Sequence, residues 1–308
     1  MSPRRVSVVV PTKNGMATLP AVLDALDKQR EGFALEIVAV DSGSDDGTRA
    51  LLASRVDRLI EIRAEAFDHG TARNTGIEGA RGELVVLLVQ DAVPASDTWL
   101  SALVAPLLAD PTVAGTFARQ TPRPDASALA RLMLSRWVAA SREGRVVALT
   151  TPAALEAMTP MERLLFCAFD NVCSCIRRTV WHEHPFRRTP IAEDLQWARE
   201  VLLAGYRLAY VPEAVVVHSH DRSAWHEFAR TRALHRRLFE LFELQTIPGL
   251  PALARAIATS MVLHLRCESA HPENIPRAVA LAVAWPLGQY AGARAAARPR
   301  QSGSHDAR

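Results

Sequence analysis

The sequence predicts an α/β fold, in which a mostly parallel sheet is flanked by helices and followed by a helical C-terminal appendage. Two observations support this class. Apolar runs of strand length alternate with helical periodicities from residue 6 to residue 109, and this alternation is typical of βαβ units. Residues 84–89 are apolar at every position, as in a strand that is buried on both faces of a parallel sheet.

The elements of the N-terminal part follow from these patterns. Short runs rich in Val, Leu and Ile predict strands at 6–10, 35–40, 58–62, 84–89 and 113–119. Apolar residues at helical spacing predict helices at 17–30, 46–55 and 96–109, and a further helix that ends near Ala80.

The pattern is less regular after residue 120. Residues 126–168 are expected to be a helical or irregular insertion. A strand is expected at 170–176, a helix at 191–204 that ends at Gly205, and two short strands at 206–210 and 214–217. The region from Ser223 onward is predicted to be mostly helical, with breaks at four prolines, namely Pro248, Pro251, Pro272 and Pro276.

Composition limits the class of protein. The chain is 49% hydrophobic and 22% charged, which is typical of a globular protein. No signal peptide or transmembrane run is expected. The spacing of the four cysteines fits neither a zinc site nor a disulfide framework, and buried thiols in a reducing cytosol are the expected state. Residues 222–308 contain 12 Arg and six acidic residues, a net charge of +6, which leaves −3 for residues 1–221.

Polar side chains follow three of the predicted strands, at 11–14, 41–44 and 90–91. Because the carboxyl ends of parallel strands share one edge of a sheet, these residues are expected to converge there. Glycine-rich phosphate-binding motifs are absent from the sequence, so a bound nucleotide would need a metal ion or arginines. Two interpretations of Asp91 remain open: it ligates Mg²⁺ or Mn²⁺, or it caps the helix near Ser96.

Two further groups allow a functional and a structural interpretation. Glu193 and Asp194 open a predicted helix, where they would complement the helix dipole or supply a general base. His218 and His220 follow a predicted strand, and residues at i and i+2 of an extended chain project to one side. They are expected to be either a polar strand end or metal ligands.

Taken together, these motifs resemble family 2 glycosyltransferases. The resemblance covers about residues 5–220 and rests on V-V-P-T-K-N at 9–14, D-S-G-S-D-D-G-T at 41–48, R-N-T-G at 73–76, Q-D-A at 90–92 and A-E-D at 192–194. A rhamnosyltransferase-like subgroup is indicated by D-H-G-T at 68–71, N-V-C-S at 171–174 and V-H-S-H at 217–220.

The resemblance implies a Rossmann-like GT-A fold and an inverting transfer of a sugar, with rhamnose among the candidates, from a nucleotide-diphosphate sugar. Asp194 would be the catalytic base, and Mg²⁺ or Mn²⁺ would be bound by Asp91 and His218. The donor would be bound by Pro11, Thr12, Asn14, Asp41, Ser44, Arg73, Gln90 and Asp91. One departure is that Q-D-A replaces the more usual D-x-D, so that Asp91 is the single carboxylate of the motif.

The implied domains are a catalytic domain at 1–221, a helical region at 222–298 and a disordered tail at 299–308. The catalytic domain would have a nucleotide-sugar half at 1–120 and an acceptor half at 121–221. The acceptor is expected to be a glycan or a lipid-linked glycan of bacterial surface polysaccharide synthesis. A non-catalytic nucleotide-sugar- or glycan-binding protein on the same fold is the alternative.

The basic C-terminal region leaves two interpretations open. Amphipathic helices at 225–243 and 275–290 would lie on an anionic membrane at the inner face of the cell membrane, or they would pack against the catalytic domain or a second subunit. No nucleic-acid partner is expected, because the region lacks interleaved surface aromatics and any recognised binding module.

Overall fold

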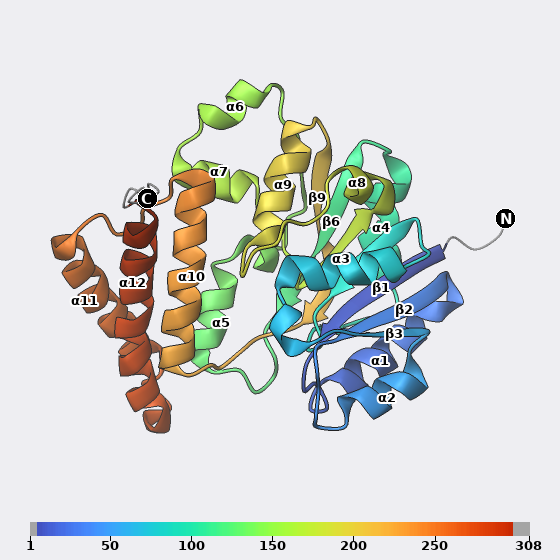
Figure 1. Cartoon of the computed structure of the whole chain (residues 1–308). Coiled ribbons are helices and arrows are strands. Elements are labelled where there is room, and N and C mark those ends of the chain that lie inside the picture. Colours follow the sequence, from blue (N-terminus) through green and yellow to red (C-terminus); the bar gives the residue numbers. More distant parts are fainter. Residues whose placement is uncertain (1–4, 298–308) are drawn as a thin grey trace, which may run out of the picture. The chain divides into compact units, whose positions relative to one another are not determined.

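The computed structural model describes residues 5–297 and divides the chain into two compact units, residues 1–221 and 222–308 (Figure 1). The tail expected at 299–308 lies outside the described residues.

The first unit is built on a nine-stranded sheet, which confirms the predicted α/β class. Four strands form its parallel half in the order β3-β2-β1-β4, and they are β1 (Arg5–Thr12), β2 (Ala34–Asp41), β3 (Arg58–Glu61) and β4 (Leu84–Leu88). All five residues of β4 are buried, as expected for a strand covered on both faces. The carboxyl ends of β1, β2 and β4 therefore meet at one edge.

The rest of the sheet is mixed. β8 (Cys173–Arg177) runs antiparallel between β4 and β6 (Val113–Thr121), and β6 pairs in parallel with β9 (Arg207–Val217). Two short strands, β5 (Val93–Pro94) and β7 (Arg145–Val147), pair antiparallel with β9. The prediction of two strands at 206–210 and 214–217 was wrong, because β9 is continuous and absorbs residues 212–214 in a register shift against β6.

Helices cover both faces of the sheet in this unit (Figure 1). The α-helices that follow the first strands are α1 (Leu19–Asp27), α2 (Thr48–Arg55), α3 (His69–Gly79) and α4 (Trp99–Ala109), and the 3₁₀ turns are η1 (Lys28–Glu31) and η2 (Ala64–Ala66). The insertion contains α5 (Ala128–Ser135), η3 (Val138–Ala140), α6 (Pro152–Glu156) and α7 (Pro160–Phe166), and α8 (Arg178–Glu183) and α9 (Glu193–Leu203) follow β8.

Close packing fixes α3 against the sheet. A Cβ atom added at Gly76 would lie 2.3 Å from Cγ1 of Val9 and 3.1 Å from Cγ2 of Val40. Only glycine allows the helix to come this close to β1 and β2. Because Arg73 lies on the same helix, this packing also determines where its guanidinium enters the interior.

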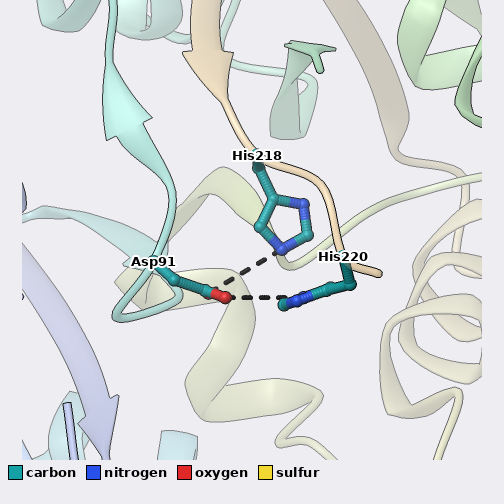
Figure 2. A group of neighbouring side chains, drawn as sticks. All are labelled: Asp91, His218 and His220. Atoms are coloured by element: carbon teal, nitrogen blue, oxygen red, sulfur yellow. Dashed lines mark ion pairs between the residues drawn. The ribbon is translucent and has the colours of Figure 1, made fainter. Parts of the chain in front are cut away.

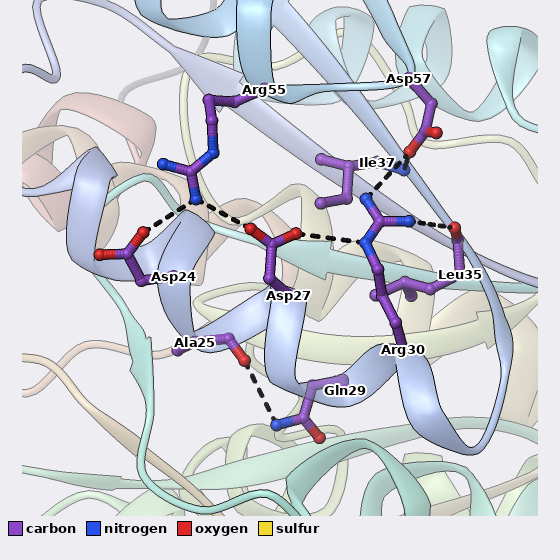
Figure 3. A network of polar contacts seen from close by, with 9 residues as sticks. All are labelled: Asp24, Ala25, Asp27, Gln29, Arg30, Leu35, Ile37, Arg55 and Asp57. Atoms are coloured by element: carbon purple, nitrogen blue, oxygen red, sulfur yellow. Dashed lines mark hydrogen bonds and ion pairs between the residues drawn. The ribbon is translucent and has the colours of Figure 1, made fainter.

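A polar network joins α1 to its neighbours (Figure 3). Arg55 of α2 contacts Asp24 and Asp27, and Arg30 contacts Asp27 and Asp57. These groups are substantially exposed, so each pair contributes about 0.2–1 kcal/mol at most. Gln29 differs because it is buried. Its Nε2 donates to the carbonyls of Ala25 and Ser96, and its Oε1 accepts from the amide of Leu100.

Within residues 222–297, the second unit contains three long helices, α10 (Ala224–Phe242), α11 (Leu250–Cys267) and α12 (Ile275–Ala297), with the 3₁₀ turn η4 (Pro272–Asn274) before the last. Gly288 and Gly292 of α12 lie against the backbone of α10. Pro251 and Pro276 do not break helices as predicted; they occupy the first turns of α11 and α12, where a missing amide proton costs nothing. Within residues 5–297, none of the helices combines the length and apolar character needed to cross a bilayer.

Candidate functional site

The loops after β1 and β2 are bound to each other at the carboxyl edge of the sheet. The amide of Asn14 donates to Oγ of Ser44 at 2.9 Å, and Oδ1 of Asn14 accepts from the amide of Asp45 at 3.0 Å. Asn14 has a φ of 49°, a left-handed conformation that asparagine tolerates better than most residues. Two of the predicted nucleotide-binding residues, Asn14 and Ser44, are therefore linked by a hydrogen bond.

Asp41 is the last residue of β2 and is fully buried. Its Oδ2 accepts from the amides of Gly43 and Ser44, and its Oδ1 accepts from the hydroxyls of Thr12 and Ser44. These four bonds occupy the lone pairs of the carboxylate. A nucleotide base could bind Asp41, as the sequence predicts, only by displacing one of them, and this role stays a prediction.

Gln90 connects the loop after β4 to the loop after β1. Its Oε1 accepts from the amide of Lys13 at 2.9 Å, and its Nε2 donates to the carbonyl of Lys13 at 3.0 Å. A Cβ at Gly15 would lie 2.8 Å from Oε1 of Gln90, so glycine makes room for the pairing. The side chain thus has a structural role, and its predicted contact with the donor remains a prediction.

Asp91 lies beside two histidines, as Figure 2 shows. Its Oδ1 is 3.7 Å from Nε2 of His218, and its Oδ2 is 3.4 Å from Nε2 of His220. One ligand atom from each of the three residues lies within 4.8 Å of the others. Atoms bound about 2.1 Å from a shared cation are separated by similar distances. The set fits a divalent metal ion, and we call it the Asp91 cluster.

The short strand β5 positions this cluster. Val93 pairs with Val217 and Pro94 with Val216, which brings the residue two places before β5 next to the residue just after β9. The amide of His218 also donates to the carbonyl of Thr121, at the end of β6. Asp91 does not cap the next helix, because Thr98 occupies the N-cap position of α4.

Asp194 lies in the first turn of α9, behind Ala192, whose φ of 61° is left-handed. Its Oδ1 accepts from the amide of Leu195 and its Oδ2 from the amide of Asn171. Burial raises the pKa of Asp194 to about 8, and the nearby carboxylates of Glu193 and Asp170 add to the shift. A carboxyl with such a pKa is suited to take a proton near neutral pH.

Arg73 supplies the positive charge behind Asp194. Its Nη1 lies 2.7 Å from Oε1 of Glu193, and both side chains are about 5% exposed. Nη1 also donates to the carbonyl of His69, and Nη2 donates to the carbonyl of Asn171. The guanidinium is therefore engaged inside the protein, and its predicted contact with the nucleotide stays a prediction.

Sequence reasoning missed two residues that join these groups. Oε1 of Gln120 lies 3.0 Å from Nδ1 of His218, and Nε2 of Gln120 donates to Oδ2 of Asp170 at 2.7 Å. Gln120 is a polar residue at the end of a strand, the same signal that drew attention to Asp41 and Asp91. Asp170 lies next to Asn171, whose amide contacts Asp194.

Hollows on the described surface lie at both edges of the sheet. One, of about 480 Å³, lies at the carboxyl edge between the start of α3 and the loop before α9, and is lined by Phe67, Asp68, His69, Arg188, Thr189 and Pro190. The other lies at the opposite edge, among the starts of β1, β2 and β3, and is far from every predicted site residue. The first is therefore the better candidate for a substrate, although the Asp91 cluster does not line it.

Comparisons with known proteins agree with this geometry. Residues 7–166 match the family model "Glycosyl transferase family 2". The O-antigen chain rhamnosyltransferase RfbN of Salmonella typhimurium is 30% identical over 233 residues, which cover 73% of this chain and 70% of that protein. The O-antigen chain rhamnosyltransferase WbaN of Salmonella anatum is 31% identical, over 73% of this chain and 69% of that protein.

Solved structures show the same fold. A mannosyltransferase from Pyrobaculum calidifontis in complex with GDP-Man and Mn²⁺ has a TM-score of 0.54 and 23% identity, covering 91% of this chain and 76% of that chain. Glucosyl-3-phosphoglycerate synthase from Mycobacterium tuberculosis in complex with Mn²⁺, UDP and glucosyl-3-phosphoglycerate has a TM-score of 0.55 and 20% identity, covering 80% and 83%. The GT-A fold expected from the sequence is confirmed.

The buried ion pair yields a stability prediction. Arg73→Met leaves Glu193 buried without its cation, and we expect it to lower the free energy of unfolding by about 3–5 kcal/mol in urea denaturation. The double variant Arg73→Met/Glu193→Met should recover much of this loss. The exposed pair of Arg49 and Glu61 is the control, because Arg49→Met should cost about 0–1 kcal/mol. A double variant as unstable as the sum of its single changes would contradict the coupling.

Proposed function

Because the chain belongs to glycosyl transferase family 2, we propose that it transfers a sugar, with inversion, from a nucleotide-diphosphate sugar to a hydroxyl group of its acceptor. One observation carries this proposal. Asp194, a carboxyl with a raised pKa, lies at the same sheet edge as the Asp91 cluster, which offers a carboxylate and two imidazoles. The two are linked by contacts through Gln120, Asp170 and Asn171. A displacement at an anomeric carbon needs both a base and a stabilised leaving group.

The Asp91 cluster would hold Mn²⁺ or Mg²⁺. Two imidazoles and one carboxylate are softer donors than the all-oxygen sets typical of Mg²⁺, which favours Mn²⁺. When bound, the ion would supply positive charge for the diphosphate oxygens. His220 joins the predicted ligands Asp91 and His218 and offsets the missing second carboxylate of the Q-D-A motif.

Asp194 would act as the base. As the acceptor oxygen forms its bond to the anomeric carbon, the bond from that carbon to the diphosphate oxygen breaks, and its electron pair leaves with the nucleoside diphosphate. Asp194 takes the proton of the acceptor hydroxyl. The amides of Leu195 and Asn171 orient the carboxylate, and this single displacement requires no covalent intermediate.

The names of two relatives suggest the sugar and the acceptor, and the residues at the strand ends suggest where the nucleotide binds. The names of two relatives, O-antigen chain rhamnosyltransferases, support rhamnose as the sugar and a growing surface glycan as the acceptor. The nucleotide would lie over the ends of β1 and β2 and the loops that follow them, which hold Pro11, Thr12, Asn14, Asp41 and Ser44. Gln90 and Arg73 would lie behind it. We place the enzyme in the cytoplasm, where nucleotide sugars would be its donors. A non-catalytic binding protein is the alternative.

Substitution of Asp194 distinguishes a catalytic function from nucleotide binding alone. Asp194→Asn should lower turnover by about 10²- to 10⁴-fold, while nucleoside diphosphate with Mn²⁺ should still raise the melting temperature. The activity would be measured as nucleoside diphosphate released from a panel of nucleotide sugars, with and without Mn²⁺. In the wild type, kcat/KM should rise with pH through about 8, because only the ionised carboxylate accepts a proton.

Asp125→Asn is the control for this experiment, because the side chain of Asp125 is 74% exposed. Undiminished sugar transfer by Asp194→Asn would show that the base is another residue. Donor binding by the wild type with no transfer to any acceptor would favour the binding protein.

We also propose that the second unit contacts an anionic membrane. Exposed apolar residues form a line along the first part of α12, the α12 stripe, made of Pro276, Val279, Ala280, Val283 and Leu287. α11 and α12 contain four arginines and no acidic residue. An apolar face with only positive charge is the combination that anionic lipid attracts. α12 packs against the backbone of α10 at Phe228 and Arg232, and Trp225 of α10 stays 76% exposed.

Vesicle binding tests this surface in the full chain. Val283→Glu/Leu287→Glu should weaken sedimentation with vesicles of mixed phosphatidylglycerol and phosphatidylcholine by at least about tenfold, because it adds two negative charges to the apolar line. Leu108→Glu, at an equally exposed position of α4, should bind like the wild type. If the wild type does not bind the vesicles but forms a dimer that the double variant cannot form, the α12 stripe is a self-association surface and the membrane proposal is wrong.

A further inference from the structure

We infer that Gln120 is a positioning residue that holds His218 in one tautomer, with the proton on Nδ1 and the lone pair of Nε2 directed at Asp91. This inference rests on the proposed function of the Asp91 cluster, because it concerns how one of its members is prepared to bind a cation. It assigns a role to a residue that lies outside every sequence motif discussed above.

The sheet fixes the place of Gln120. It is the penultimate residue of β6, where it pairs with Val216 of β9, two residues before His218. It is only 5% exposed. The amide of His218 donates to the carbonyl of Thr121, the residue after Gln120, so the two side chains are held on adjacent strands. Their contact is therefore a consequence of the backbone pairing.

Asp170 determines which way the amide of Gln120 faces. Oδ2 of Asp170 accepts from Nε2 of Gln120 at 2.7 Å and from Nε1 of Trp137 at 2.8 Å, and Oδ1 accepts from the amide of Val172 at 2.9 Å. Both carboxylate oxygens thus face N–H groups, and an indole N–H can only donate. The NH₂ group of Gln120 must point at Asp170, which leaves its carbonyl oxygen toward His218.

The tautomer of His218 follows from this orientation. Oε1 of Gln120 only accepts, so Nδ1 of His218, 3.0 Å away, must carry the proton. In a neutral imidazole the other nitrogen then has the lone pair, and this is Nε2, which faces Oδ1 of Asp91. A hydrogen bond from the second nitrogen of a metal-binding histidine fixes both ring orientation and tautomer. Hydrogen bonds from Gln120 to Asp170 and from His218 to Gln120 provide this arrangement.

The tautomer can be measured directly in the metal-free protein. Long-range ¹H–¹⁵N spectra of histidine-labelled full chain, recorded well above the ordinary pKa of histidine, should show His218 as the Nδ1–H form. Gln120→Met keeps the length and burial of the side chain but removes the acceptor. It should shift His218 toward the Nε2–H form that predominates in free imidazole side chains. A wild-type His218 in the Nε2–H form would overturn the inference.

Metal affinity provides the second measurement. Gln120→Met should raise the dissociation constant for Mn²⁺, followed by electron paramagnetic resonance, by roughly 10- to 100-fold. Gln29→Met is the matched control, since Gln29 is equally buried and bonded through both amide atoms. It should reduce stability and leave Mn²⁺ affinity unchanged. Equal affinities of the wild type and Gln120→Met would count against the inference.

The two measurements distinguish a failure of this inference from a failure of the proposed metal function. If the wild type binds no Mn²⁺ yet shows the Nδ1–H form, the proposed metal function fails while the positioning of His218 stands. If it binds Mn²⁺ but His218 has the other tautomer, the role of Gln120 fails while the metal function stands.

Discussion

The short antiparallel pairing of β5 with the end of β9 is the constraint on which the site depends. Asp91 follows a strand of the parallel half of the sheet, whereas His218 and His220 follow a strand more than a hundred residues later in the mixed half. The pairs of Val93 with Val217 and Pro94 with Val216 join these two ends. These pairs bring the carboxylate of Asp91 beside the two imidazoles. β8 and β6 lie between β4 and β9 in the sheet, so β5 joins the ends of two strands that are not neighbours.

Charge balance is the second organising feature. Asp170, Glu193 and Asp194 bring three carboxyls together around Asn171, and Arg73 is the cation that pairs with Glu193. Burial is the main cause of the raised pKa of Asp194; the charges of Glu193 and Asp170 add to the rise, and Arg73 opposes it. Asp170 acts on both ends of the site, because its charge adds to this shift while its oxygens orient Gln120 beside His218. The proposed base and the proposed metal site thus share one carboxylate.

Much of the fold and part of the site could be predicted from local sequence. Strand residues in β4 and the polar residues after β1, β2 and β4 leave a local signal, because apolar runs end abruptly at the sheet edge. The pairing of β5, which has only two residues, leaves no such signal. The bonds that engage Gln90 with Lys13, and Gln120 with Asp170, join residues far apart in the sequence. Gln90, which the sequence predicts to bind the donor, also has a backbone partner in Lys13 that only the folded chain reveals.

Anomalous diffraction from crystals of the full chain with Mn²⁺ and a nucleoside diphosphate tests the central claim most directly. We expect an anomalous peak about 2.2 Å from a carboxylate oxygen of Asp91 and from Nε2 of His218 and His220, with the diphosphate completing the coordination. A peak held by other residues, with Asp91 and both histidines outside coordination distance, would contradict the claim that the β5–β9 pairing assembles a metal site.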